Sequence, residues 1–187
     1  MFEKKQTGSF EEKFMDYWKL KKFALATVAS YFLRDEVRIK EFIQKIPFRD
    51  FSLKTKDGKK CDIFPWKLFP NLNENNFFGF LPEIKELSIG IPKNYKIGNT
   101  LLDAPIWDYE VFVGISDTAD DGKVGFILGY LSKESLTPER YLETKSKPST
   151  DNPMHDLTAW QFKISDLKPF SGIEHLMTLE IINPPQS

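Results

Sequence analysis

The sequence predicts an α+β fold, in which N-terminal helices pack on a mostly antiparallel, partly mixed β-sheet with a C-terminal helix or turn. Two observations lead to this prediction. Apolar residues recur at a helical spacing up to residue 46, and strand-like apolar runs separated by turn residues begin at residue 48. With 187 residues, the chain is long enough to bury a full hydrophobic core. We therefore expect a single domain over residues 1–187, with a helical part over about 9–46 and a sheet part over about 48–182.

The helical part is predicted to contain two helices. Ser9-Phe-Glu-Glu12 matches a capping box, in which Ser9 is the N-cap and Glu12 reaches back to it. The apolar residues that follow at a roughly helical spacing predict a helix to about Leu33. These residues are Phe14, Trp18, Leu25, Val28 and Phe32. The apolar stretch Phe23–Leu33 is too short to span a bilayer and predicts a buried helix. A second, shorter helix is expected from Val37 to Ile46, where Pro47 stops it.

The first predicted hairpin joins two runs, Phe48–Lys54 and Cys61–Trp66, through the turn signal Asp57-Gly58. Four lysines crowd this turn, which indicates a solvated tip; a loop that contacts phosphate is the alternative. After a polar loop over residues 70–76, short strands are expected at Phe77–Leu81 and Ile84–Ile91.

The best strand pair is predicted at Asp108–Ser116 and Lys123–Leu131. Both runs are apolar on both faces, so we expect them to lie centrally with other elements packed on each side. Their glycines indicate a bulge or the close approach of a helix; these are Gly114, Gly125 and Gly129. Ser132–Leu136 begins a helical turn, and about residues 143–157 form a polar, mobile loop. Ala159–Ile164 is expected as the last strand, before a helix or turn around Leu167, Ile173, Leu176 and Met177.

The composition argues against several classes of function. The single cysteine, Cys61, excludes an intramolecular disulfide and a cysteine-based zinc site. Only two histidines, His155 and His175, are present, and neither a phosphate-binding loop nor a nucleophile motif occurs. The acidic turn over residues 117–122 lacks most ligand positions of a calcium loop and predicts a hairpin turn. The first thirty residues contain no signal-peptide pattern, so we expect a cytoplasmic protein with no membrane partner.

The charge is unevenly distributed along the chain. Residues 1–100 contain 19 Lys and Arg against 13 Asp and Glu, and residues 101–187 contain 7 against 14. This split predicts either one basic and one acidic face, or a mixture when the two halves interleave in the fold. The net charge of −1 does not favour nucleic acid as a partner.

One set of polar residues has the pattern of a metal site. Asp62 lies in a predicted strand, and Glu83-Ile-Lys85 follows in the next, where alternation would point Glu83 and Lys85 to one face. Two carboxylates can hold Mg²⁺ while a lysine orients or activates the attacking water. In the alternative interpretation, Glu83 and Lys85 form the polar face of an edge strand. Together with an early helix that opens Gly8-Ser-Phe-Glu-Glu12, these residues resemble the restriction-endonuclease-like PD-(D/E)XK fold over residues 8–131. That resemblance implies a Mg²⁺-dependent nuclease, or its inactive descendant, with Asp62 and Glu83 as metal ligands and Lys85 as the catalytic base or orienter.

A second resemblance covers more of the chain. Trp107–Val113, Ile127–Leu131, Leu136 and Phe162–Leu167 resemble a family of uncharacterised cyanobacterial proteins, a domain of unknown function. The resemblance implies an accessory or regulatory role rather than a metabolic enzyme. The few histidines, the single cysteine and the 14% aromatic content point the same way. We therefore predict a non-enzymatic adaptor or regulatory domain without a cofactor, whose partner is another protein; the Mg²⁺-dependent nuclease is the alternative.

Overall fold

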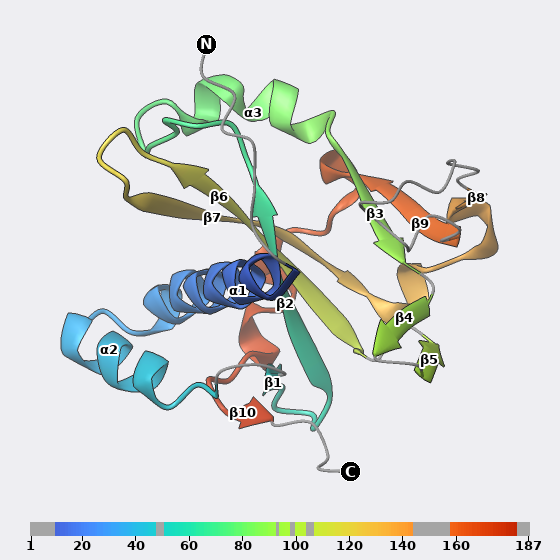
Figure 1. The fold of residues 1–187 in the computed structure, drawn as a ribbon, viewed down its shortest axis with the longest axis horizontal. Coiled ribbons are helices and arrows are strands. Elements are labelled where there is room, and N and C mark those ends of the chain that lie inside the picture. The colour runs from blue at the N-terminus through green and yellow to red at the C-terminus, as the bar shows by residue number, and fades with distance from the viewer. Residues whose placement is uncertain are drawn as a thin grey trace.

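The computed structural model describes residues 10–47, 51–92, 94–97, 100–103, 107–143 and 158–182 (Figure 1). Within these ranges the chain is α+β, as predicted. The helices are α1 (Phe10–Phe32), α2 (Glu36–Gln44) and α3 (Phe77–Lys85). The strands are β1 (Ser52–Lys54), β2 (Lys60–Lys67), β3 (Ser88–Pro92), β4 (Asn94–Ile97), β5 (Thr100–Asp103), β6 (Tyr109–Asp117), β7 (Lys123–Ser132), β8 (Tyr141–Glu143), β9 (Thr158–Lys163) and β10 (Ile181–Ile182).

The main sheet has five strands in the order β10-β1-β2-β6-β7. Its pairs are antiparallel except β2 with β6, which run parallel because the chain between them crosses over through α3 and strands β3 to β5. The partly mixed, mostly antiparallel sheet is therefore confirmed. The smaller sheets are β3-β9-β8 and the hairpin β4-β5.

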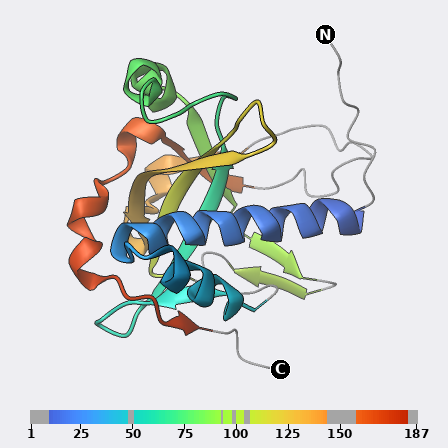
Figure 2. The ribbon, with the colours of Figure 1, turned by 90° about the vertical axis from the view of Figure 1, so that its left-hand side faces the viewer.

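The two N-terminal helices form as their sequence predicts. Leu25 and Val28 on α1 are fully buried, and Figure 2 shows the helix lying across the main sheet. The Asp35 side chain caps α2 by accepting a hydrogen bond from the Val37 N–H at 2.9 Å. None of the helices in the described ranges is long and apolar enough to cross a membrane. The predicted capping box depends on Ser9, which lies outside the described residues.

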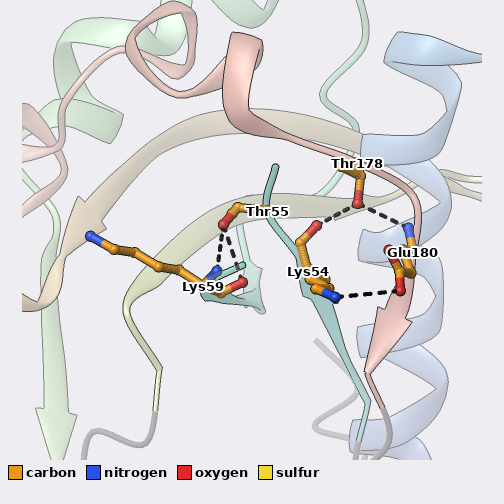
Figure 3. A network of polar contacts seen from close by, with 5 residues as sticks. All are labelled: Lys54, Thr55, Lys59, Thr178 and Glu180. Carbon is orange, nitrogen blue, oxygen red and sulfur yellow. Dashed lines mark hydrogen bonds and ion pairs between the residues drawn. The ribbon is translucent and has the colours of Figure 1, made fainter. Parts of the chain in front are cut away.

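Polar contacts stabilise the lysine-rich hairpin between β1 and β2 and connect it to Thr178 and Glu180 (Figure 3). The Lys59 N–H donates to Thr55 Oγ1 at 3.0 Å, and the Thr178 hydroxyl donates to the Lys54 carbonyl. Lys54 Nζ lies 3.9 Å from Glu180, and Lys59 Nζ lies 3.9 Å from Asp57. Two of the four lysines of this turn are thus in ion pairs within the chain.

The predicted pair β6–β7 is present, but of the two only β6 lies between two other strands of the sheet. β7 is the last strand of the sheet, so the expectation that both strands lie centrally was wrong for β7. The glycine prediction is confirmed for Gly125 and Gly129 but not for Gly114, where a Cβ would meet the Leu68 side chain rather than a helix. A Cβ on Gly125 would lie 2.1 Å from Thr27 Oγ1 of α1, and Gly129 has a φ of +147° next to the β-bulge opposite Phe112.

Two hydrophobic clusters lie on either side of β6. Val111 and Val113 join the cluster that contains Leu25 and Val28 of α1. Phe112, between them in sequence, joins the cluster with Ile84 of α3 and strands β3 and β9. Alternate residues of one strand therefore serve two cores, which explains why its sequence is continuously apolar.

Two predicted strands differ from the structure. Phe77–Leu81 is the start of helix α3, and the strand expected from Ile84 begins only at Ser88. Phe77 and Leu81 are half-buried and Ile84 is fully buried, so a helical i, i+4, i+7 stripe governs this segment.

The C-terminal region was predicted nearly in full. β9 matches the expected strand within a residue, and the expected turns are short 3-10 helices at residues 164–166, 170–172 and 174–176. β9 is not the last strand, however, because β10 follows and pairs with β1. Of the loop expected at about 143–157, Glu143 ends β8, and residues 144–157 lie outside the described ranges.

Candidate functional site

The three residues of the predicted metal site occupy two different kinds of element. Asp62 lies on β2 as expected, whereas Glu83 and Lys85 lie on helix α3 and are exposed. On a helix, residues two apart are rotated by about 200° about its axis, so the strand alternation that would align Glu83 with Lys85 does not apply. In the described part of the chain, no group of three His, Cys, Asp or Glu side chains is arranged to hold a metal ion.

Asp62 is instead paired with a lysine of α1. Its carboxylate lies 2.6 Å from Lys21 Nζ, and the side chains of Lys21 and Asp62 are 7% and 22% exposed. The same ammonium lies 5.2 Å from the ring of Trp18 and 5.1 Å from the ring of Phe51, both at cation–π distance. A buried ammonium needs these partners, because burial of an unpaired charge is costly.

Glu110 completes this polar cluster from β6. It is the register partner of Asp62 across the parallel β2–β6 pair and is 2% exposed. Its Oε2 is buried and makes no hydrogen bond within the described residues. Burial raises the pKa of Glu110 well above its usual value, the negative charge of Asp62 raises it further, and Lys21 lowers it.

The Lys21–Asp62–Glu110 cluster is electrically balanced when Glu110 keeps its proton. One cation then faces one anion, and no net charge is buried. The neighbouring Cys61 is also buried, and burial raises the pKa of its thiol, so it is not a reactive thiolate. We assign the cluster to the attachment of α1 to the sheet rather than to chemistry.

Sequence reasoning missed Lys21 and Glu110, although each leaves a signal. Lys21 falls on the apolar stripe of α1, three residues after Trp18 and four before Leu25. Glu110 is the only charged residue between Tyr109 and Ser116 in an otherwise apolar strand. A charged residue at an apolar position of a predicted element is the pattern that indicates a buried ion pair.

A second feature is an aromatic surface on α3. Phe78 is 75% exposed and Phe80 is 42% exposed. Phe77 stacks on Phe126 of β7 with ring centroids 4.2 Å apart, and the ring of Phe80 lies 6.2 Å from that of Phe69. These five residues, Phe69, Phe77, Phe78, Phe80 and Phe126, are called the α3 aromatic surface below.

The loop before α3 is fastened to the end of β6. The Ser116 hydroxyl accepts a hydrogen bond from the Leu72 N–H at 2.9 Å and donates one to the Phe69 carbonyl at 2.6 Å. The Asn71 N–H donates to the Asp117 carbonyl at 2.8 Å, and Asn71 adopts a φ of +64°. These bonds hold α3 in a fixed position although its outer face is exposed.

A shallow groove lies elsewhere, between α2 and the segment that contains β10. Its volume is about 430 Å³, and it is lined by Arg38, Glu41, Phe42, Lys45, Pro47, Leu179 and Ile181. His175 is exposed, and His155 lies outside the described residues.

Comparison with models of known protein families finds no match. Curated proteins and solved structures likewise give no significant match.

Proposed function

We propose that this protein is a non-enzymatic protein-binding domain, an adaptor or regulatory accessory protein, and that the α3 aromatic surface is where its partner binds. The observation that carries the proposal is the exposure of Phe78 and Phe80, 75% and 42%, on one short helix. The two rings project from different sides of α3, because residues two apart on a helix are rotated by about 200° about its axis. Each contacts a further ring, Phe78 that of Phe77 and Phe80 that of Phe69, and exposed aromatic side chains are enriched at protein interfaces.

The energetic argument follows from the area that these rings expose. Full burial of one phenylalanine side chain contributes about 1.5–3 kcal/mol. Because a phenylalanine ring has only two side-chain torsions, it loses little conformational entropy when a partner covers it. The hydrogen bonds of Ser116 and Asn71 already fix the helix, so binding would not require α3 to become ordered.

The test is recovery of a partner from the native host with tagged protein. We expect one stoichiometric partner to be retained by the wild type and lost by Phe78→Ser/Phe80→Ser, because the variant removes the apolar contacts but no buried group. A matched control is Glu36→Gln/Val37→Ser, which changes an exposed acid and a 62%-exposed valine at the far end of the molecule on α2 (Figures 1 and 2).

The control variant should retain the partner at the wild-type level. Equal recovery of the partner by the wild type and by Phe78→Ser/Phe80→Ser would show that the interface lies elsewhere. A monomer that retrieves nothing in stoichiometric amount would count against the whole proposal.

A further inference from the structure

We infer that the open edge of β10 and the groove beside it form a second binding site, which takes an extended, acidic peptide segment of another protein by β-strand addition. This site is separate from the α3 aromatic surface, because α3 and β10 lie at opposite ends of the molecule (Figures 1 and 2). Unpaired backbone groups, an apolar groove and an excess of basic side chains meet at this place.

The hydrogen bonds between β1 and β10 show which backbone groups of β10 point outward. β10 is the end strand of the main sheet, and among the described strands it pairs only with β1. The Lys54 N–H donates to the Glu180 carbonyl at 2.8 Å, so these two residues form a hydrogen-bonded pair. Because bonded and non-bonded pairs alternate along an antiparallel ladder, the next pair, Leu53 with Ile181, is not hydrogen-bonded. The Ile181 N–H and C=O therefore point to the open edge.

The residues just before β10 lengthen this edge. Leu179 lies two residues before Ile181, and both side chains are half-buried and line the groove. The Leu179 N–H and C=O make no backbone hydrogen bond to any other described residue. An extended peptide laid along this edge can thus pair with the backbone of both residues, as in other cases of β-strand addition.

The groove lies where side chains of an added strand would enter. Its volume is about 430 Å³, and Phe42 of α2 and Pro47 line it opposite Leu179 and Ile181. Ile181 packs against the core cluster that contains residues of α1 and α2, so its side chain lies on the helix-covered face of the sheet. An added strand directs every second side chain to that face. One apolar side chain of the peptide would therefore contact Phe42.

The charges of the groove favour an acidic peptide. Arg38 and Lys45 lie seven residues apart on α2 and hence on the same side of the helix, with Glu41 between them. All three are exposed, and none forms an ion pair with another described residue. Two bases and one acid attract a carboxylate and disfavour a basic segment. A second copy of the chain would bring four bases and two acids together.

The first experiment selects binders of the full-length wild type from a phage-displayed library of random octapeptides. We expect enrichment of sequences with an acidic residue two positions from an apolar one, because residues i and i+2 of a strand share a face. The control Glu36→Gln/Val37→Ser should select the same sequences, because these two residues lie on α2 but do not line the groove.

The second experiment separates backbone pairing from side-chain contact. Binding of one selected, labelled peptide is measured by fluorescence anisotropy for the wild type, Ile181→Ala and Ile181→Pro. Both variants shorten the side chain, but only proline removes the outward N–H, which β1 does not use. Ile181→Pro should bind about three- to tenfold more weakly than Ile181→Ala, the effect of one hydrogen bond.

N-methylation of the peptide repeats this test on the unchanged wild type. Methylation of the alternate amides that face β10 should abolish binding, whereas methylation of the other alternate amides should have little effect, because only one set points to the sheet edge. This measurement does not depend on the folding of a variant.

The contribution of charge is tested with two variants of α2. Arg38→Gln/Lys45→Gln should weaken binding of the selected peptide about three- to tenfold at about 0.05 M NaCl and less at about 0.3 M, because exposed charges are screened. Glu41→Gln should strengthen binding, because it removes the one acid that lines the groove.

Four outcomes would overturn the inference. They are a library that yields no enriched sequence, enrichment of basic sequences, a selected peptide that tolerates N-methylation at every position, and a concentration-dependent dimer of the wild type that Ile181→Pro abolishes. The dimer would identify a second copy as the occupant. None of these outcomes bears on Phe78 or Phe80, so the proposed function succeeds or fails in its own test.

Discussion

Replacement of Glu110 by glutamine should flatten the dependence of stability on pH. In the unfolded chain this carboxyl ionises near its usual pKa of about 4.5, whereas burial and the charge of Asp62 raise its pKa in the folded protein. Between these two pKa values the folded state binds one proton that the unfolded state has released. Stability that comes from this group is therefore fully present below about pH 4.5 and is lost as the pH rises.

The magnitude follows from a difference of one proton. Each pH unit in that window lowers the free energy of unfolding by up to about 1.4 kcal/mol, until Glu110 ionises in the folded state. Glutamine has nearly the same shape and does not titrate, so Glu110→Gln should lack this slope. The variant should consequently gain stability relative to the wild type as the pH rises.

Urea unfolding followed by circular dichroism, from about pH 5 to about pH 8, measures both slopes. The difference between the two proteins isolates Glu110, because every other group titrates in both. Glu139→Gln, a change at an exposed glutamate, is the control and should follow the wild type. Parallel curves for the wild type and Glu110→Gln would refute the claim that the folded protein retains this proton.

Three further predictions concern the packing of α1 and the alternative activity. Lys21→Met should lower the free energy of unfolding, measured in urea, by about 3 kcal/mol. This is the lower end of the range for a broken buried ion pair, because the Asp62 side chain is 22% exposed. Lys21→Met/Asp62→Leu should be more stable than Lys21→Met, and equal stability of the two proteins would contradict this. Gly125→Ala should lower it by about 1–3 kcal/mol, because its Cβ would meet Thr27 Oγ1 at 2.1 Å, and Thr27→Ala should restore part of that loss. The wild type should not cleave DNA or RNA with Mg²⁺ or Mn²⁺; cleavage that Lys85→Ala abolishes would replace the adaptor proposal by the nuclease.

The elements that sequence predicts well are those set by local signals. The β1–β2 hairpin follows from Asp57-Gly58, where Gly58 has a φ of +80°, and β6 and β7 follow from long apolar runs around one turn. α3 was mistaken for a strand because a short apolar run fits both periods, and its length and the anchoring of its N-terminus are decided by tertiary contacts. The Leu72 N–H donates a hydrogen bond to Ser116, which lies 44 residues further along the chain. That bond could not be predicted from the sequence around α3.

The candidate sites were less predictable because their partners are distant in the chain. Asp62 was predicted as a metal ligand on a strand, yet its partners come from α1 and from β6. The parallel β2–β6 register that pairs it with Glu110 has no local signal. Exposure of Phe78 could not be inferred either. An apolar run predicts burial on average, and only the packing of Phe77, Leu81 and Ile84 toward the core leaves Phe78 facing out.

Two features depart from the usual pattern of burial: a cluster of charged side chains is buried, and an aromatic ring is exposed. Lys21, Asp62 and Glu110 place polar groups where apolar ones would stabilise equally well, and such groups favour a single arrangement because any shift of α1 leaves a charge unpaired. Phe78 places an apolar group where a polar one would suffice. Because its ring stays largely exposed, it contributes little to the stability of the fold. The buried Lys21–Asp62–Glu110 cluster is explained by its role in the core. Burial of the Phe78 ring, in contrast, would contribute free energy only when another molecule covers it. That asymmetry directs the search for function to α3 rather than to the buried acids.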